Sequence, residues 1–310
     1  MIFKEILEKK CKAVSQEIEK LIDTAFVKQS HKGDLLLVYV NGFYNEDVFK
    51  WNNIKEKLSP YSVGPNTEGH SEMLHYDFID NYRKNGIVKL SFEEYKEKIV
   101  YSPEKRKEID ELEKLEGMSI QLEMLIYLKI WESDAFIKRL YQLLRLINGE
   151  PYDWNFKIAE SSRDNNVTGT RQEIIRKEIR NRLEKEFPTL FSSIRKAYVT
   201  QIRNSIAHSK YSFLGRNIHP NNYIEKDKSA QLKNVPFDEW IEIFHETLAI
   251  YNGYIQAMNL IQKIYSEMSK INIVTEVRAI EKQEVEIEKI MRLEFRPEWK
   301  DWNWEQNLKN

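Results

Sequence analysis

Residues 203–208 read R-N-S-I-A-H and place a permanent cation close to a group that exchanges a proton near neutral pH. Cleaving RNA through its own 2′-hydroxyl needs a base at that hydroxyl, a charge on the phosphorane and an acid at the leaving oxygen. Arg203 could supply the charge and His208 the proton transfer, with Asn204 orienting groups by hydrogen bonds. The alternative interpretation is a helix end that is held together by a hydrogen-bonded, partly buried polar pair.

The helix that carries these residues must end near them if they are to act together. Side chains five residues apart on an unbroken α-helix diverge by about 140°. Arg203 and His208 can converge only if the helix ends or tightens between Asn204 and Ala207. Lys210, Tyr211 and the later Gly215 are consistent with an end at this point.

The apolar periodicity predicts a mainly α protein. Four helices are expected in its larger part, at about 117–147, 170–186, 188–208 and 237–268. Capping boxes at Ser91–Glu94 and Thr170–Glu173 mark two helix starts. Outside the bundle, a helix is expected at 2–29, loops at 59–70 and 211–234, and a possible strand at Ile87–Leu90, while residues 285–287 fit a strand or a helix.

We expect three segments: an N-terminal elaboration of mixed helix and strand (1–105), a helical bundle (106–275) and a charged, Trp-rich tail (276–310).

Charge is uneven within the bundle. The chain carries a net charge of −1, which argues against a bulk polycation for duplex DNA. Residues 168–210 nevertheless hold ten basic and four acidic side chains. This basic stretch ends on the motif, and Arg180, Arg195 and Lys196 are its candidates for RNA contact, although a solvated helix face is the simpler interpretation for any one of them.

The motif and its helical setting resemble the HEPN superfamily, whose nucleases carry R-x(4–6)-H, commonly with a polar residue after the arginine. The resemblance implies a HEPN-like helical bundle and a metal-independent endoribonuclease of a toxin–antitoxin or phage-defence system, with Arg203, Asn204 and His208 as catalytic residues. It also implies a homodimer with a composite cleft and an acidic or polar residue on an earlier helix, for which Glu132 and then Asp134 are the candidates. One toxin branch reads R-x4-H-x-Y, whereas Tyr211 follows His208 by three residues. We therefore keep Lys210 and Tyr211 only as supporting candidates.

Other chemistries have little support in the sequence. Its single cysteine, Cys11, excludes a disulfide within the chain and a cysteine-based zinc site. The segment 64–71 has P-loop spacing but carries His70 in place of the essential lysine. His70, Glu72, His75 and Asp77 are expected to be polar loop residues and not metal ligands. We expect no metal, no cofactor and no membrane span, a cytoplasmic location, and RNA with a possible antitoxin or defence protein as partners. The remaining hypotheses are a non-catalytic module that binds RNA or protein, and a sensor subunit.

Overall fold

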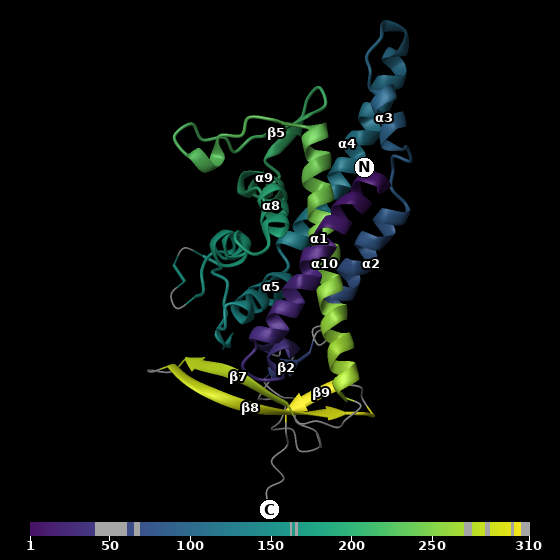
Figure 1. The fold of residues 1–310 in the computed structure, drawn as a ribbon. Coiled ribbons are helices and arrows are strands. Elements are labelled where there is room, and N and C mark those ends of the chain that lie inside the picture. Colours follow the sequence, from purple (N-terminus) through teal and green to yellow (C-terminus); the bar gives the residue numbers. More distant parts are fainter. Residues whose placement is uncertain are drawn as a thin grey trace, which may run out of the picture. The chain divides into compact units, whose positions relative to one another are not determined.

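The computed structural model describes residues 1–40, 61–64, 69–161, 163–164, 167–269, 275–282, 286–298 and 301–304. The protein is mainly helical with small sheets, as the sequence predicts (Figure 1). The principal helices are α1 (Lys4–Lys28), α2 (Gly69–Lys84), α3 (Phe92–Lys98), α4 (Arg106–Trp131), α5 (Asp134–Ile147), α8 (Pro188–Ala197), α9 (Thr200–Ala207) and α10 (Phe237–Ser269). Shorter helical turns are η1 (Asp34–Leu36), η3 (Pro103–Lys105), α6 (Arg171–Glu173), η4 (Ile174–Arg180), α7 (Asn181–Leu183) and η5 (Lys228–Ala230).

The chain forms two compact units, each assembled from three separate segments. The first unit comprises residues 1–17, 73–136 and 183–253, and the second comprises residues 18–72, 137–182 and 254–310. These units cut across the three segments expected from the sequence, and the division into 1–105, 106–275 and 276–310 stays a prediction.

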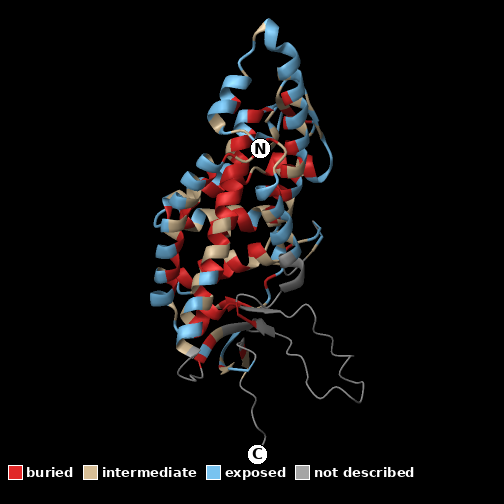
Figure 2. Ribbon diagram, turned by 90° about the vertical axis from the view of Figure 1, so that its right-hand side faces the viewer, coloured by how far each residue is buried: buried red, intermediate tan, exposed pale blue. Residues whose placement is uncertain are grey.

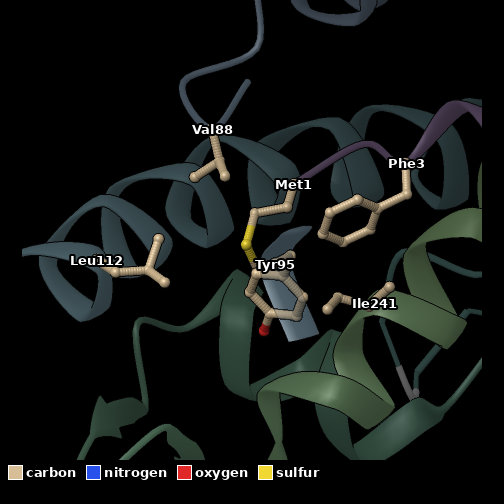
Figure 3. Packing of buried hydrophobic residues seen from close by; sticks show 6 residues of the cluster. All are labelled: Met1, Phe3, Val88, Tyr95, Leu112 and Ile241. Atoms are coloured by element: carbon tan, nitrogen blue, oxygen red, sulfur yellow. The ribbon is translucent and has the colours of Figure 1, made fainter. Parts of the chain in front are cut away.

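The first unit has an apolar core. One cluster gathers Met1, Phe3, Val88, Tyr95, Leu112 and Ile241 (Figure 3). Trp131 and Trp240, both fully buried, each contact the ring of Tyr127. A three-stranded antiparallel sheet, β4 (Tyr211–Phe213), β5 (Asn217–Pro220) and β6 (Val235–Pro236), lies between α9 and α10 in the chain. Burial follows the inner faces of the helices (Figure 2), as expected for amphipathic segments.

The second unit is built on a four-stranded sheet in the order β3-β7-β8-β9. Its strands are β3 (Tyr152–Asp153), β7 (Thr275–Lys282), β8 (Glu286–Arg296) and β9 (Asp301–Trp304). β7 pairs antiparallel with β8 and parallel with β3, and a separate antiparallel pair joins β1 (Val38–Val40) to β2 (Tyr61–Val63). Gly33 approaches β7 so closely that a Cβ there would lie 2.8 Å from the Glu276 carbonyl oxygen.

Several predictions of local structure are confirmed. Helices α1 and α10 lie where periodicity placed them. Both capping boxes are present, with the hydroxyls of Ser91 and Thr170 accepting hydrogen bonds from the backbone N–H groups of Glu94 and Glu173. The helix opened by Thr170 is π-helical through its middle, at Ile174–Arg180.

Other predictions are wrong, chiefly because tertiary contacts override local pattern. The predicted helix 117–147 begins earlier, at Arg106, and is interrupted at residues 132–133. There the Ser133 hydroxyl accepts a hydrogen bond from the Phe136 N–H, which caps the start of α5. The segment Ile87–Leu90 forms no strand, and its Val88 inserts into the core cluster instead. The predicted loop 211–234 contains β4 and β5, and the predicted loop 59–70 contains β2 and the start of α2. Residues 286–287 belong to strand β8, while residue 285 lies outside the described residues.

Candidate functional site

The motif lies on α9, a helix of eight residues that follows a break at Tyr198–Val199. The sequence predicted one helix from Pro188 to the motif, and this prediction is wrong. Tyr198 and Val199 both have extended backbone conformations, with ψ values of 97° and 107°. The break gives α9 its own direction, so the motif is positioned by whatever holds this joint.

Tyr127 of α4 holds the joint. Its hydroxyl donates a hydrogen bond to the Ala197 carbonyl oxygen (3.0 Å) and accepts one from the Val199 N–H (3.2 Å). Burial raises the pKa of the Tyr127 hydroxyl, which therefore stays protonated as the donor. The Val199 carbonyl in turn accepts the backbone N–H of Arg203 at 2.9 Å. Tyr127 is thus linked to the motif arginine through a single residue.

The Arg203 guanidinium lies between two oxygen acceptors. Its Nε forms an ion pair with the carboxylate of Glu132, the residue that caps the C-terminus of α4. Its Nη1 donates a hydrogen bond to Asn204 Oδ1 at 2.8 Å. The hydrogen bond with Glu132 raises the pKa of Arg203, so its charge is permanent. The side chains of Arg203 and Glu132 are 23% and 32% exposed, so the pair is open to solvent and accessible to an anion.

His208 is presented from the turn that ends α9. The N–H of Ser209 donates to the Ile206 carbonyl oxygen (3.1 Å) and the N–H of Lys210 donates to the Ser205 carbonyl oxygen (2.7 Å). These two bonds form a Schellman motif, in which Ser209 adopts the left-handed conformation (φ 51°) that usually belongs to glycine. His208 itself lies at the C-cap and is exposed. Helix α9 thus runs through Ala207, and the His208 N–H still bonds the Asn204 carbonyl oxygen, so the helix ends at His208 itself and not between Asn204 and Ala207.

Asn204 is the residue that contacts both ends of the motif. Its side-chain oxygen accepts from Arg203, and its backbone carbonyl accepts the His208 N–H at 3.2 Å. The structure therefore brings together Glu132, Arg203 and Asn204 through side chains and attaches His208 through the backbone. A permanent cation and an exposed imidazole on one short helix end can bind a phosphate and exchange a proton.

A loop is fastened to the buried side of α9. The side-chain amide of Gln201 donates to the Leu232 carbonyl oxygen (2.8 Å) and accepts from the Leu232 N–H (2.7 Å). The side chain of Asn222 donates to the Gln201 carbonyl oxygen at 2.9 Å. Gln201 is buried, so its paired hydrogen bonds stabilise α9 from the side opposite the exposed motif.

The other supporting candidates lie on separate elements. Asp134 is exposed at the first residue of α5. Lys210 is exposed in the turn after His208, and its carbonyl oxygen accepts the Asn221 N–H at 2.8 Å. Tyr211 is half-buried and begins β4, with its ring 5.8 Å from that of Phe213. Glu132, the fourth supporting candidate, contacts the motif through its side chain.

The three predicted RNA-contact residues do not form one described group. Arg195 and Lys196 are exposed in the last turn of α8. Lys196 Nζ lies 3.7 Å from a carboxylate oxygen of Glu242 and 4.0 Å from one of Glu246, so part of its charge is offset. Arg180 belongs to the second unit, where it donates two hydrogen bonds to Asn181 Oδ1, at 3.0 and 2.8 Å. Of the three, Arg195 and Lys196 share a unit with the motif.

The sequence pattern does not predict the roles of Tyr127 and Gln201 at the site. Both fall on buried helix faces, where an aromatic ring or an amide looks like ordinary packing. The one available signal was the pair Tyr198–Val199, in which an aromatic and a β-branched residue interrupt a helix-forming stretch.

The described residues include no group of three or more His, Cys, Asp or Glu side chains placed to hold a metal ion. His70, Glu72, His75 and Asp77, expected in a loop, lie in helix α2. Among the helices that the structure describes, none is both long enough and apolar enough to cross a membrane.

Comparison with known proteins adds no family assignment. No family model, no curated protein and no solved structure matches this chain. The function must therefore be argued from the residues and their geometry.

Proposed function

We propose that this protein is a HEPN-like, metal-independent endoribonuclease that cleaves single-stranded RNA at the site formed by Arg203, Asn204 and His208. The observation that carries the proposal is the cation held by Glu132 and Asn204 at the end of a short helix that presents an exposed histidine. The helical setting supports the resemblance to HEPN nucleases. RNA is the expected substrate because the reaction uses the 2′-hydroxyl, which DNA lacks.

The reaction assigns a separate task to each residue. The 2′-oxygen attacks the adjacent phosphorus, the bond to the 5′-oxygen breaks, and a 2′,3′-cyclic phosphate is left on the upstream fragment. His208 takes the proton from the 2′-hydroxyl or gives one to the leaving 5′-oxygen, a contribution of roughly 10²–10⁴-fold. Arg203 stabilises the negative charge on the phosphorane, which is worth roughly 10²–10³-fold. Asn204 and Glu132 orient the guanidinium.

Each chain offers one motif histidine, whereas the reaction needs both a base and an acid. A second copy joined through the motif face would bring a second His208 to the same phosphate. A two-fold symmetric dimer is the simplest such arrangement, since it places identical surfaces against each other. We include this homodimer, and a role in a toxin–antitoxin or defence system, in the proposal.

A second candidate function is a non-catalytic module that binds RNA or a partner protein, or a sensor subunit. The ion pair between Arg203 and Glu132 favours this function, because a pair that joins α9 to α4 also serves a purely structural purpose. In that case the basic side chains near the motif would bind without cleaving.

Substitution of the motif residues separates the two functions. His208→Ala and Arg203→Ala should each abolish RNA cleavage, and any toxicity on expression, while circular dichroism spectra stay unchanged. Arg203→Lys should also be poor, since an ammonium cannot reproduce a bidentate phosphate contact. His219→Ala, a half-buried histidine of β5 outside the motif, is the matched control and should keep activity. A wild type that binds RNA without cutting it would establish the second function, whereas a His208 variant that cleaves as well as the wild type would show that the motif is not the catalytic site.

A further inference from the structure

Helix α4 presents an apolar stripe to solvent along its outer face. Leu115, Met118 and Leu125 are 42%, 56% and 51% exposed, and Leu122 lies between them, half-buried. Isolated exposed leucines are common, but four apolar side chains on one face of a helix form a continuous strip. This strip belongs wholly to the first unit.

The spacing of this stripe is that of a coiled-coil seam. The positions 115, 118, 122, 125 and 129 alternate steps of three and four residues, which is the heptad pattern of a and d positions. The exposed Glu111 occupies the seam position before Leu115, and Lys129 occupies the last one. The Lys129 Nζ lies 5.4 Å from the centre of the Phe78 ring on α2, where Phe78 and Leu74 are 36% and 72% exposed. The apolar surface therefore continues from α4 onto α2.

We propose that this stripe binds the same stripe of a second copy of the chain, with the two α4 helices antiparallel about a two-fold axis. In that register Leu115 faces Leu125 of the second copy, and Met118 faces its Leu122. Glu111 then faces Lys129 of the second copy, so both ends of the seam carry opposite charges. Every layer joins an a position to a d position, as an antiparallel coiled coil requires.

Other registers are poorer by the same criteria. A parallel pairing sets Glu111 against Glu111 and Lys129 against Lys129, which places like charges opposite each other. Sliding the antiparallel pair by one heptad sets Leu115 against Glu132 and Met118 against Lys129, which buries charges among apolar side chains. The sequence of the seam thus selects one arrangement, and the surface is complementary to itself.

This interface is independent of the proposed ribonuclease site. Glu132, which holds Arg203, faces residue 108 of the second copy in this register. At 1.5 Å per residue, the two Glu132 residues lie about 36 Å apart along the seam. The α4 pair therefore leaves the motif faces of both copies separate, and it differs from the composite cleft that joins two motifs.

Charge reversal at the seam tests the pairing without reference to activity. Glu111→Lys or Lys129→Glu alone should raise the dimer dissociation constant at least tenfold in sedimentation or light scattering, because each change occurs twice in a two-fold interface. The double variant should restore association to within about threefold of the wild type, because the two charges are merely exchanged. Asp110→Lys, the same charge change one residue away from the seam, is the control and should leave association unchanged. A wild type that stays monomeric up to millimolar concentration, or single variants that form assemblies of the same size and dissociation constant as the wild type, would overturn the proposal, because the motif-face dimer does not depend on Glu111 or Lys129.

Cysteine cross-linking tests the register directly. In a Cys11→Ser background, a mixture of Leu115→Cys and Leu125→Cys chains should form a disulfide-linked dimer that neither chain forms alone. The two residues 115 of a pair lie about 15 Å apart along the seam, which is beyond the span of a disulfide. Equal cross-linking of a single variant with itself would contradict the antiparallel register. Either result is obtained with catalytically inactive protein, so failure here is distinguishable from failure of the proposed ribonuclease.

Discussion

Removing one hydroxyl from Tyr127 should weaken both the fold and the site. Tyr127→Phe leaves the Ala197 carbonyl and the Val199 N–H without the partner that each has now, in a setting where the Tyr127 side chain is fully buried. An unpaired buried polar group costs about 1–3 kcal/mol, so the two together should lower the free energy of unfolding by about 2–6 kcal/mol. The ring itself stays, so its contacts with Trp131 and Trp240 are retained.

Urea denaturation followed by circular dichroism measures this loss. Tyr101→Phe removes the same hydroxyl from an exposed ring and should change the free energy of unfolding by less than about 0.5 kcal/mol. The site should respond too, because the Val199 carbonyl that binds the Arg203 N–H belongs to the joint that Tyr127 holds. We expect kcat/KM for RNA cleavage to fall about tenfold or more from misplacement of the arginine. If Tyr127→Phe is as stable as the wild type, the hydroxyl does not hold the break between α8 and α9.

Three more predictions follow from single residues. Ser209→Gly should raise the free energy of unfolding by about 0.5–1 kcal/mol in urea titration, because glycine adopts the left-handed conformation of this residue without steric cost. A lower free energy of unfolding would contradict the Schellman geometry. Glu132→Gln should lower kcat/KM for RNA cleavage about tenfold but lower the free energy of unfolding by less than about 1 kcal/mol, since the ion pair is partly exposed. A large loss of stability with full activity would show that the ion pair is purely structural. Burial lowers the pKa of His245 to about 4, whereas its pKa in the unfolded chain is about 6.5. Between these two pH values only the unfolded state binds the proton, so the free energy of unfolding falls as the pH is lowered through this window. The wild type should lose about 2 kcal/mol between pH 7.5 and pH 5 from this residue, and His245→Gln should lose correspondingly less over the same range.

Amphipathic periodicity was sufficient to predict the long helices. α10 keeps an apolar face over 33 residues, and the capping boxes at Ser91 and Thr170 bind their own neighbours, so neither depends on distant segments. The end of α9 was predictable for a similar reason, since the hydrogen bonds that terminate it join residues 205–210.

Features that depend on distant partners escaped prediction. The break before α9 is stabilised by Tyr127, which precedes Ala197 by seventy residues, and no local pattern announces such a contact. The strands β4 and β5 are three and four residues long, too short for alternation to distinguish them from a loop. Only the resemblance points to Glu132 as a partner of the motif, because the apolar periodicity continues through residues 117–147 and hides the C-cap of α4 at Glu132.

The chemistry of the product ends decides whether Arg203 and His208 cleave RNA without a metal ion. Purified protein should be incubated with a single-stranded RNA in the presence of EDTA, and the fragments analysed by mass spectrometry. We expect a 2′,3′-cyclic phosphate on the upstream fragment and a 5′-hydroxyl on the downstream fragment, no cleavage of DNA of the same sequence, and no cleavage by His208→Ala. A strict requirement for magnesium or manganese, or products that carry a 5′-phosphate, would contradict this mechanism.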